Sequence, residues 1–341
     1  MSWAFIQHAT EYMSRPRLGD KKPPTLWPSE ATAIITNQYG EQEVVGKCRR
    51  ATFFRYLLDS YEFDRKFINY KPLVEELKGK SIPTDPYLQW IWRAGELYEE
   101  HLIGLAKASG VYIADQVPIY APQWNLSGKI DLVVVNPDTG LFSAVEVKSV
   151  YGFNANFVLG TPTDRKKGQL GTPKDSNLMQ IALYDWWYAS EHSGFEESRL
   201  VYGARDTGRF AEYAIKTPYD EEKSQYNITY EGLAPTDTSP TTSPITIDSI
   251  LAQYKFVSDS LDNGKIPARD FDQQYSDEKI ALLHSRGELS KADSERVAKR
   301  LEQIQQGKDK LNKQIEKGDF QCNFCQFAKV CYNENGTSRN L

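Results

Sequence analysis

The stretch of sequence that decides the fold runs from Gly128 to Lys148 and reads GKIDLVVVNPDTGLFSAVEVK. It contains two apolar, β-branched runs, 130–135 and 142–147, joined by the turn-forming segment Asn-Pro-Asp-Thr-Gly. Runs of this kind separated by turn residues predict a β-hairpin of two adjacent antiparallel strands. The other elements of the fold can be placed around this hairpin.

Charged side chains lie at the ends of both predicted strands. Asp131 is at the start of the first strand, and Glu146 and Lys148 are at the end of the second. Antiparallel pairing brings these ends together, and alternate residues of a strand share a face, so Glu146 and Lys148 point the same way. Charges in apolar strands are costly to bury unless they are paired or bind a metal. The three residues therefore indicate a functional site.

The composition is that of a soluble globular protein of 341 residues, with 40% hydrophobic and 26% charged residues. The net charge of −5 provides no strongly basic field, so a nucleic-acid partner requires a local basic groove. No apolar run approaches the roughly 20 residues that span a bilayer, and the N-terminus lacks the features of a signal peptide. We therefore expect a cytoplasmic (intracellular) protein without a membrane partner.

Further elements are predicted on both sides of the hairpin. A helix over 86–106 precedes a strand over 111–120, and a helix over 177–190 precedes strands over 199–205 and 210–216. The resulting order is helix, three strands, helix, strands. It predicts an α/β fold with a central mixed β-sheet flanked by helices.

The first of these helices supplies a third candidate carboxylate. At about 100° per residue, Glu99 lies within its apolar sector, His101 on the flank and Glu100 nearly opposite. A carboxylate directed towards the core is unusual, because Glu is almost never fully buried without a partner. Glu99 is therefore expected to join Asp131 and Glu146, with His101 as the alternative and Glu100 as a surface charge.

These three carboxylates and the lysine have a direct chemical rationale. Carboxylates are hard oxygen ligands that suit Mg²⁺ or Mn²⁺, ions that keep several waters and bind phosphate oxygens. Such an ion activates a water and stabilises charge on the attacked phosphate and the leaving oxygen. Lys148 could orient or deprotonate that water. Asp followed by Glu-x-Lys is a weak pattern by itself, and its position at the ends of paired apolar strands strengthens it.

The four cysteines form a second pattern. Cys322, Cys325 and Cys331 have the spacing C-x2-C-x5-C, and Cys48 is the only other cysteine. Because an intracellular protein keeps its thiols reduced, the set suits Zn²⁺ or an iron–sulfur cluster better than disulfides. Four unrelated thiols are the alternative, which the tight C-terminal spacing disfavours. The split of one and three favours a cluster, because a zinc knuckle usually draws its thiols from two close pairs.

Together the patterns resemble the RecB-type nucleases of the PD-(D/E)xK superfamily, in the branch that carries a 4Fe–4S cluster. That branch includes the CRISPR-associated adaptation exonucleases and the AddB nuclease domain. Its motifs are a glycine followed four residues later by His or Glu, then G-x-x-D, E-x-K and Q-x-x-x-Y. The chain has them in this order: Gly95 with Glu99, Gly128 with Asp131, Glu146 with Lys148, and Gln180 with Tyr184.

The resemblance spans about residues 48–331 and implies metal-dependent hydrolysis of DNA by a restriction-endonuclease-like core. The metal ligands that it implies are Glu99, Asp131, Glu146 and the carbonyl of Val147. The catalytic set that it implies is Asp131, Glu146, Lys148, Gln180 and Tyr184, of which the last two position the DNA strand. The residues that it assigns to a structural 4Fe–4S cluster are Cys48, Cys322, Cys325 and Cys331.

We therefore expect a Mg²⁺- or Mn²⁺-dependent deoxyribonuclease, an exonuclease on single-stranded DNA or duplex ends. It would serve recombination, DNA repair, CRISPR adaptation or a phage. The sequence has no G-x4-G-K-S/T loop, so any unwinding must come from a partner such as a helicase. The alternative is a DNA-end-binding or scaffold subunit with little catalysis, against which the complete set of acids and lysine argues.

Five parts are expected along the chain. They are an N-terminal segment without strong periodicity (1–47), the nuclease core (48–216), an insertion or linker (217–247), a helical region (248–318) and a C-terminal cysteine region that joins Cys48 (319–341). The linker is inferred from the run PTDTSPTTSP, and the end of the helical region from a helix that Ser290 caps and Gly318 closes.

Overall fold

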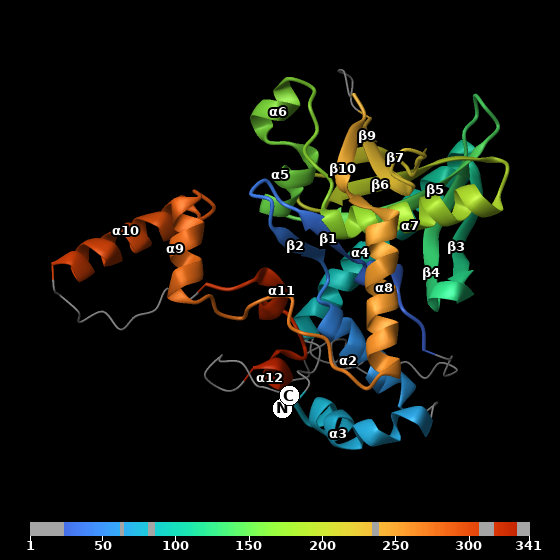
Figure 1. The fold of residues 1–341 in the computed structure, drawn as a ribbon. Coiled ribbons are helices and arrows are strands. Elements are labelled where there is room, and N and C mark those ends of the chain that lie inside the picture. The colour runs from blue at the N-terminus through green and yellow to red at the C-terminus, as the bar shows by residue number, and fades with distance from the viewer. Residues whose placement is uncertain (1–23, 62–64, 81–85, 234–238, 307–316, 333–341) are drawn as a thin grey trace, which may run out of the picture. The chain divides into compact units, whose positions relative to one another are not determined.

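The structure, a computed structural model, describes residues 24–61, 65–80, 86–233, 239–306 and 317–332 (Figure 1). The chain forms two compact units. The first unit comprises residues 1–67 and 83–267, and the second comprises residues 68–82 and 268–341. The predicted hairpin lies in the first unit, and three of the four cysteines lie in the second.

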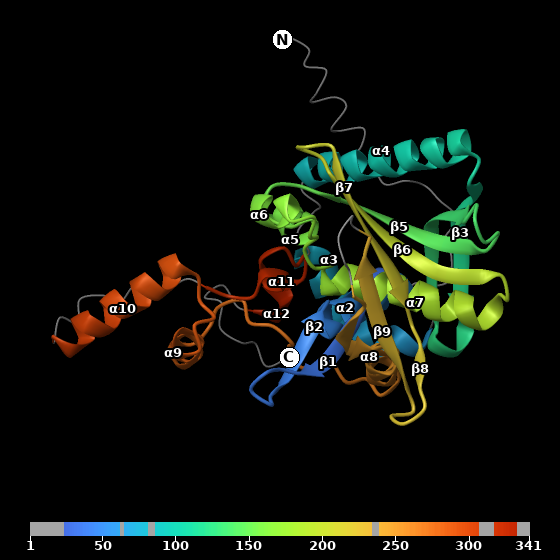
Figure 2. The ribbon, with the colours of Figure 1, turned by 90° about the horizontal axis from the view of Figure 1, so that it is seen from above.

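The first unit is built on an eight-stranded β-sheet of mixed direction (Figures 1 and 2). The strands are β3 (Tyr112–Ala121), β4 (Leu126–Val135), β5 (Phe142–Val150), β6 (Phe195–Ala204), β7 (Arg209–Lys216), β8 (Tyr219–Asp220), β9 (Gln225–Gly232) and β10 (Thr241–Thr246). Their order is β10-β9-β7-β6-β5-β4-β3, and β8 pairs with β9. β5 and β6 are parallel, and the other neighbours are antiparallel.

The predicted hairpin is confirmed as β4 and β5. Leu132 pairs with Val145 in antiparallel register. Across the turn, the backbone N–H of Asn136 donates to the carbonyl of Leu141 at 2.7 Å. Gly140 has a φ of +72°, a left-handed conformation that glycine adopts readily. The turn residues thus determine where the first strand ends and the second begins.

Helices cover both faces of the sheet, as predicted. They include α4 (Pro86–Ser109) and α7 (Asp175–Glu191). Tyr202 of β6 donates a hydrogen bond to Asn177 of α7 at 3.1 Å, and the next residue, Gly203, lies against the ring of Tyr98 of α4. Because consecutive strand residues point to opposite faces, α4 and α7 lie on opposite sides of the sheet (Figure 2).

The connection between β5 and β6 explains the position of α7. A parallel pair of strands requires a crossover connection, which here consists of α5 (Phe153–Leu159), α6 (Pro162–Lys166) and α7. The middle of α7 is buried, with Leu178, Met179, Ile181, Ala182 and Leu183 all in the core. The element order of helix, three strands, helix, strands is therefore the one that the sequence predicted.

Two segments contain more structure than the sequence indicated. Residues 1–47 include the paired strands β1 (Thr32–Thr36) and β2 (Gln42–Gly46). Residues 217–247, expected to be an insertion or linker, contain β8, β9 and β10, and the last two continue the sheet beyond β7. Tyr226, Ile228 and Tyr230 alternate along β9, but the Thr/Ser/Pro-rich run that extends into β10 indicated a linker for the whole segment.

The predicted helical region of 248–318 is divided between the two units. α8 (Ile247–Asp262) belongs to the first unit, as does α2 (Arg49–Ser60), which begins directly after Cys48. The helices of the second unit are α3 (Lys71–Lys80), α9 (Asp277–Ser285), α10 (Lys291–Gln305), α11 (Phe320–Asn323) and α12 (Ala328–Cys331). Among the described residues, no helix is long and apolar enough to cross a membrane.

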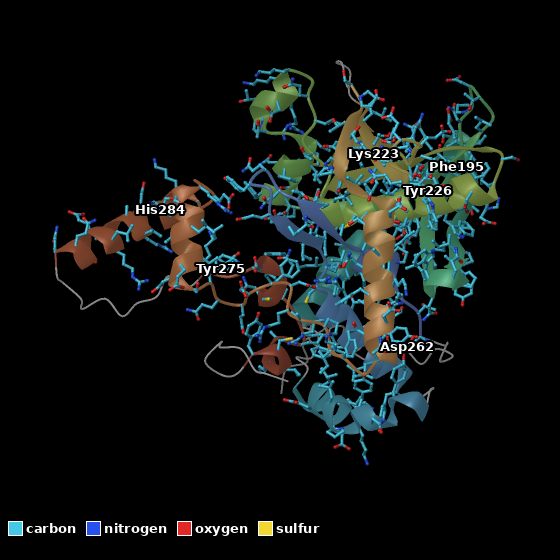
Figure 3. All side chains as sticks on the ribbon, in the orientation of Figure 1. Phe195, Lys223, Tyr226, Asp262, Tyr275 and His284 are labelled. Carbon is cyan, nitrogen blue, oxygen red and sulfur yellow. The ribbon has the colours of Figure 1, made fainter. Side chains whose placement is uncertain are left out.

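Hydrogen bonds of the second unit organise the ends of its helices. The hydroxyl of Ser290 accepts from the N–H of Asp293 at 3.2 Å, so the predicted cap of α10 is confirmed. The predicted continuation towards Gly318 passes through residues 307–316, which lie outside the described residues. Tyr275, labelled in Figure 3, donates to Asp319 at 2.6 Å. This bond ties the segment before α9 to the start of α11.

Candidate active site

Asp131, Glu146 and Lys148 lie together where the pairing of β4 with β5 stops, and both strands continue beyond the ends that the sequence predicted. The ammonium of Lys148 donates to Oε1 of Glu146 at 2.5 Å. The backbone N–H of Val147 donates to Oδ2 of Asp131 at 2.8 Å, just beyond the paired part of the two strands. The side chain of Asp131 thus contacts the second strand where regular pairing has ended, and it lies beside the Glu-x-Lys segment.

Glu146 is an almost completely buried carboxylate, with 1% of its surface exposed. Its Oε1 accepts from Lys148 and from Nε2 of Gln180, the latter at 2.7 Å. Its Oε2 is buried and accepts no hydrogen bond from the described part of the protein. Burial raises the pKa of Glu146 to about 8, against the opposing charge of Lys148. Oε2 is therefore available to a proton or a cation.

Gln180 and Tyr184 lie on one face of α7, as predicted, and both are buried. Nε2 of Gln180 also donates to the hydroxyl of Tyr184 at 3.3 Å, and that hydroxyl donates to the carbonyl of Lys129 at 3.0 Å. A continuous chain of hydrogen bonds thus runs from Glu146 to the backbone of β4. It fixes α7 against the two strands that carry the acids.

Two motif glycines allow close packing around this site. A Cβ atom on Gly128 would lie 2.9 Å from the hydroxyl of Tyr184 and 2.9 Å from Cγ of Pro28. A Cβ atom on Gly95 of α4 would lie 3.3 Å from Oγ of Ser149 on β5. Gly128 therefore admits the tyrosine hydroxyl to β4, and Gly95 admits α4 to β5. Neither glycine has a positive φ, so their role here is close approach.

Glu99 supplies the third carboxylate from α4. Burial raises its pKa to about 7, the charge of Asp131 adds to the rise, and the charge of Lys148 opposes it. Nε2 of Gln116 donates to Oε1 of Glu99 at 2.5 Å. His101, the alternative to Glu99, is exposed. Of the two candidates, Glu99 is the one within electrostatic reach of Asp131 and Lys148.

Gln116 is a site residue that the sequence did not indicate. It has a φ of +50° in the interior of β3, a conformation that L-amino acids rarely adopt. Its neighbours in β3 pair regularly with β4, so Gln116 falls opposite Asp131. Strained backbone of this kind costs about 1–3 kcal/mol and clusters at functional sites. A glutamine at a polar strand position carries no sequence signal of such strain.

The donor set fits Mg²⁺ or Mn²⁺ in its chemistry. Among the described residues, no group of three or more His, Cys, Asp or Glu side chains is already arranged to hold a metal ion. Each acid has a protein donor instead: an amide for Glu99, a backbone N–H for Asp131, an ammonium and an amide for Glu146. Burial is the largest cause of the raised pKa of Glu99 and of Glu146, and repulsion from Asp131 adds to the rise in both. A divalent cation would relieve that repulsion.

The four cysteines all lie among the described residues, and none forms a disulfide. Cys48 is in the first unit, at the N-cap of α2, and the other three are in the second unit. Burial raises the pKa of Cys322 to about 12, and the charges of Cys325 and Cys331 add to this rise. The three thiols of the second unit are therefore close enough to influence one another.

The thiol of Cys325 is largely enclosed and lies near two backbone N–H groups. Burial raises the pKa of its thiol, and hydrogen bonds from the backbone N–H groups of Phe327 and Ala328 oppose that rise. Hydrogen bonds to a sulfur support the charged form and tune iron–sulfur clusters. The environment of Cys325 is thus consistent in chemistry with a ligand for a metal or a cluster.

The chain matches no family model, no curated protein and no solved structure in comparisons with known proteins. The resemblance to iron–sulfur nucleases therefore rests on the motifs in the sequence. The arrangement of those motifs around β4, β5 and α7 adds a physical argument of its own. The class of protein stays a prediction.

Proposed function

We propose that the chain is a metal-dependent deoxyribonuclease of the PD-(D/E)xK type that hydrolyses phosphodiester bonds in single-stranded DNA or at DNA ends. The observation that carries this proposal is the meeting of buried Glu146 with Asp131 and Lys148 where the pairing of two strands stops. The order α4, β3, β4, β5, α7, β6 supports a restriction-endonuclease-like core, since it is the helix, three strands, helix, strand order that the sequence predicted.

Asp131, Glu146 and Glu99, with the carbonyl of Val147, would hold Mg²⁺ or Mn²⁺. The ion would supply Lewis acidity towards a phosphate and a more acidic water. Burial lowers the pKa of Lys148, but the charges of Glu146 and Asp131 raise it by more. Lys148 therefore keeps its proton at neutral pH. It acts as a hydrogen-bond donor that orients water and offsets negative charge, rather than as a base.

Two further sets of residues complete the proposal. Gln180 and Tyr184, fixed against Glu146, would position the DNA strand. The residues proposed to hold a 4Fe–4S cluster in a structural role are Cys48, Cys322, Cys325 and Cys331. The mutual influence of the last three and the backbone donors around Cys325 support this assignment. Zinc in the same set is the alternative.

Digestion of labelled DNA in the presence of Mg²⁺ or Mn²⁺ tests the proposal. Glu146→Ala and Lys148→Ala should each reduce the rate by about a hundredfold or more, because each removes charge that matters in the transition state. Glu100→Gln changes an exposed glutamate one residue from Glu99 and serves as the matched control.

Full activity in both Glu146→Ala and Lys148→Ala would contradict the assignment of these residues. DNA binding without turnover in any of several divalent metals would instead favour the alternative, a DNA-end-binding or scaffold subunit with little catalysis.

A further inference from the structure

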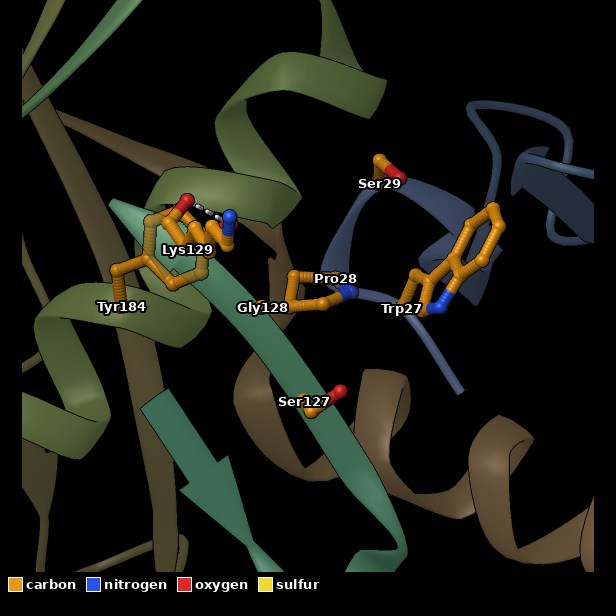
Figure 4. A pocket seen from close by; sticks show the side chains of 7 residues that line it. All are labelled: Trp27, Pro28, Ser29, Ser127, Gly128, Lys129 and Tyr184. Atoms are coloured by element: carbon orange, nitrogen blue, oxygen red, sulfur yellow. Dashed lines mark hydrogen bonds between the residues drawn. The ribbon is translucent and has the colours of Figure 1, made fainter. Parts of the chain in front are cut away.

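A pocket of about 340 Å³ opens beside β4, close to the proposed active site (Figure 4). Residues 27–29, around the short helix η1 (Pro28–Glu30), form one part of its wall. Residues 127–129 of β4 and Tyr184 of α7 form the rest. Of these lining residues, only Tyr184 has a role in the function proposed above, and residues 27–29 and 127–129 have none.

Trp27 provides an aromatic platform in this wall. The guanidinium of Arg55 stacks over its ring at 4.0 Å from the ring centre, yet 45% of Trp27 is exposed. Arg55 is itself held by ion pairs with Glu30 and Asp59. The carbonyl of Trp27 accepts from the hydroxyl of Tyr254 at 2.7 Å. One face of the indole is therefore supported by a fixed cation, and the remaining surface is open for a second planar group to stack.

The polar groups around the pocket suit an anionic ligand. The side chain of Lys129 is exposed at the pocket, and its backbone carbonyl is fixed by Tyr184. The hydroxyl of Ser127 lies 2.5 Å from the hydroxyl of Thr25, which holds the pocket wall to β4. Figure 4 shows Lys129 and Trp27 on opposite sides of the pocket, with Pro28 and Gly128 between them. An exposed ammonium and a partly exposed aromatic ring on one pocket match a phosphate joined to a base. It is the combination that binds single-stranded nucleic acid without regard to sequence.

The pocket is connected to the carboxylates by a short path. Tyr184 lines the pocket, and its hydroxyl accepts from Gln180, which also donates to Glu146. Lys129 is two residues before Asp131 on the same strand. A DNA strand with one phosphate at the carboxylates would therefore place a neighbouring nucleotide at Trp27.

We propose that this pocket binds one nucleotide of a single DNA strand, with its base stacked on Trp27 and its phosphate paired with Lys129. The inference rests on the proposed nuclease function and names a contact that this function requires outside the reaction centre. Stacking on an aromatic face is available to all four bases, so the pocket gives affinity without sequence specificity.

Binding of a fluorescent oligothymidylate to the full chain, in buffer without divalent metal, tests this pocket. Trp27→Ala should weaken binding by about tenfold, whereas Trp27→Phe keeps an aromatic ring and should retain most of the affinity. Trp92→Ala removes another tryptophan, 54% exposed on α4, and should leave binding unchanged. Lys129→Gln should reduce the slope of log affinity against log salt by about 0.7, the value for one lost phosphate contact.

Equal DNA affinities of Trp27→Ala and Trp92→Ala would contradict nucleotide binding at this pocket and would leave the proposed function intact. Absence of binding by the native protein would overturn both. Because Trp27→Ala could fail to fold, a second test follows the indole N–H signals of the native protein by nuclear magnetic resonance. Among the indole N–H signals of the 7 tryptophans, the signal lost in Trp27→Phe should shift when oligothymidylate is added. If that signal does not shift while the native protein binds DNA, the proposed stacking of a base on Trp27 is wrong.

Discussion

Glu146 combines burial with an unsatisfied oxygen, and this makes its charge state depend on what surrounds it. Lys148 and Gln180 satisfy one oxygen, and the other has no donor in the described part of the chain. In the metal-free protein a proton is the simplest way to satisfy that oxygen. A bound cation would do the same without the proton. The residue therefore couples pH to metal binding.

The stability of the metal-free protein should fall as pH rises from about 4.5 to about 8. Burial raises the pKa of Glu146 to about 8 and that of Glu99 to about 7, from an ordinary value of 4.5. In that window the folded chain binds more protons than the unfolded chain, so the free energy of unfolding decreases with pH. Urea unfolding at a series of pH values measures the slope.

Glu146→Gln should flatten this slope, because the amide carries no titrating proton. Mg²⁺ should restore stability near the upper end of the window, since it binds the ionised carboxylates. Glu100→Gln is the control and should keep the native slope. A native slope of the opposite sign, or an unchanged slope in Glu146→Gln, would contradict the pKa argument.

Gln116 should position Glu99 for metal binding. Partners that hold a metal ligand in place commonly contribute a factor of about 10–100 in metal affinity. Gln116→Gly removes the amide donor but accepts the φ of +50° without strain. We therefore expect Mn²⁺ affinity, measured by titration with electron paramagnetic resonance, to fall by about tenfold. The free energy of unfolding should be unchanged or slightly higher.

Ser224→Gly is the matched control for Gln116→Gly, since Ser224 is an exposed residue that also has a φ of +50°. It should leave the Mn²⁺ affinity at the native value. Native affinity in Gln116→Gly as well would show that the amide does not position Glu99.

At the scale of elements, the packing of α7 on β4 should depend on Gly128. Gly128→Ala would place a methyl group 2.9 Å from the hydroxyl of Tyr184 and 2.9 Å from Pro28. Overpacking of this kind costs about 1–3 kcal/mol in the free energy of unfolding. Gly104→Ala on α4 meets no atom within 4 Å and should instead be neutral or stabilising. The free energy of unfolding of both variants, measured in urea, tests this prediction. A native value in Gly128→Ala would contradict the close approach of Tyr184 to Gly128.

Local patterns accounted for the elements that build the site. Two apolar, β-branched runs and a turn ending at Gly140 predicted β4 and β5, and helical periodicity placed Glu99 in the apolar sector of α4. The same patterns missed β9 and β10, because the Thr/Ser/Pro-rich run PTDTSPTTSP indicated a linker. They also missed Gln116, because its positive φ is imposed by tertiary structure. Strong local patterns were therefore predictive, and backbone strain that depends on neighbours in space was not.

At the scale of the whole molecule, the four cysteines should bind a 4Fe–4S cluster. Protein purified without oxygen should be brown, absorb near 400 nm, roughly, and contain iron with acid-labile sulfide. Cys325→Ser and Cys48→Ser should each lose most of the iron, because each removes one of four thiolate ligands. Stoichiometric zinc without sulfide would contradict the cluster and assign zinc. Native iron content in Cys48→Ser would show that Cys48 is not a ligand of the cluster.

The most direct test of the central claim is the digestion of end-labelled single-stranded DNA by the anaerobically purified full chain. We expect digestion with Mg²⁺ or Mn²⁺, none in a chelator, and at least a hundredfold slower digestion by Glu146→Gln. The substitution keeps the size of the buried side chain and one acceptor oxygen, and it replaces a carboxylate, which binds Mg²⁺ or Mn²⁺ well, with a neutral amide. Undiminished digestion by Glu146→Gln, or a native protein that binds DNA and never cleaves it, would contradict the account.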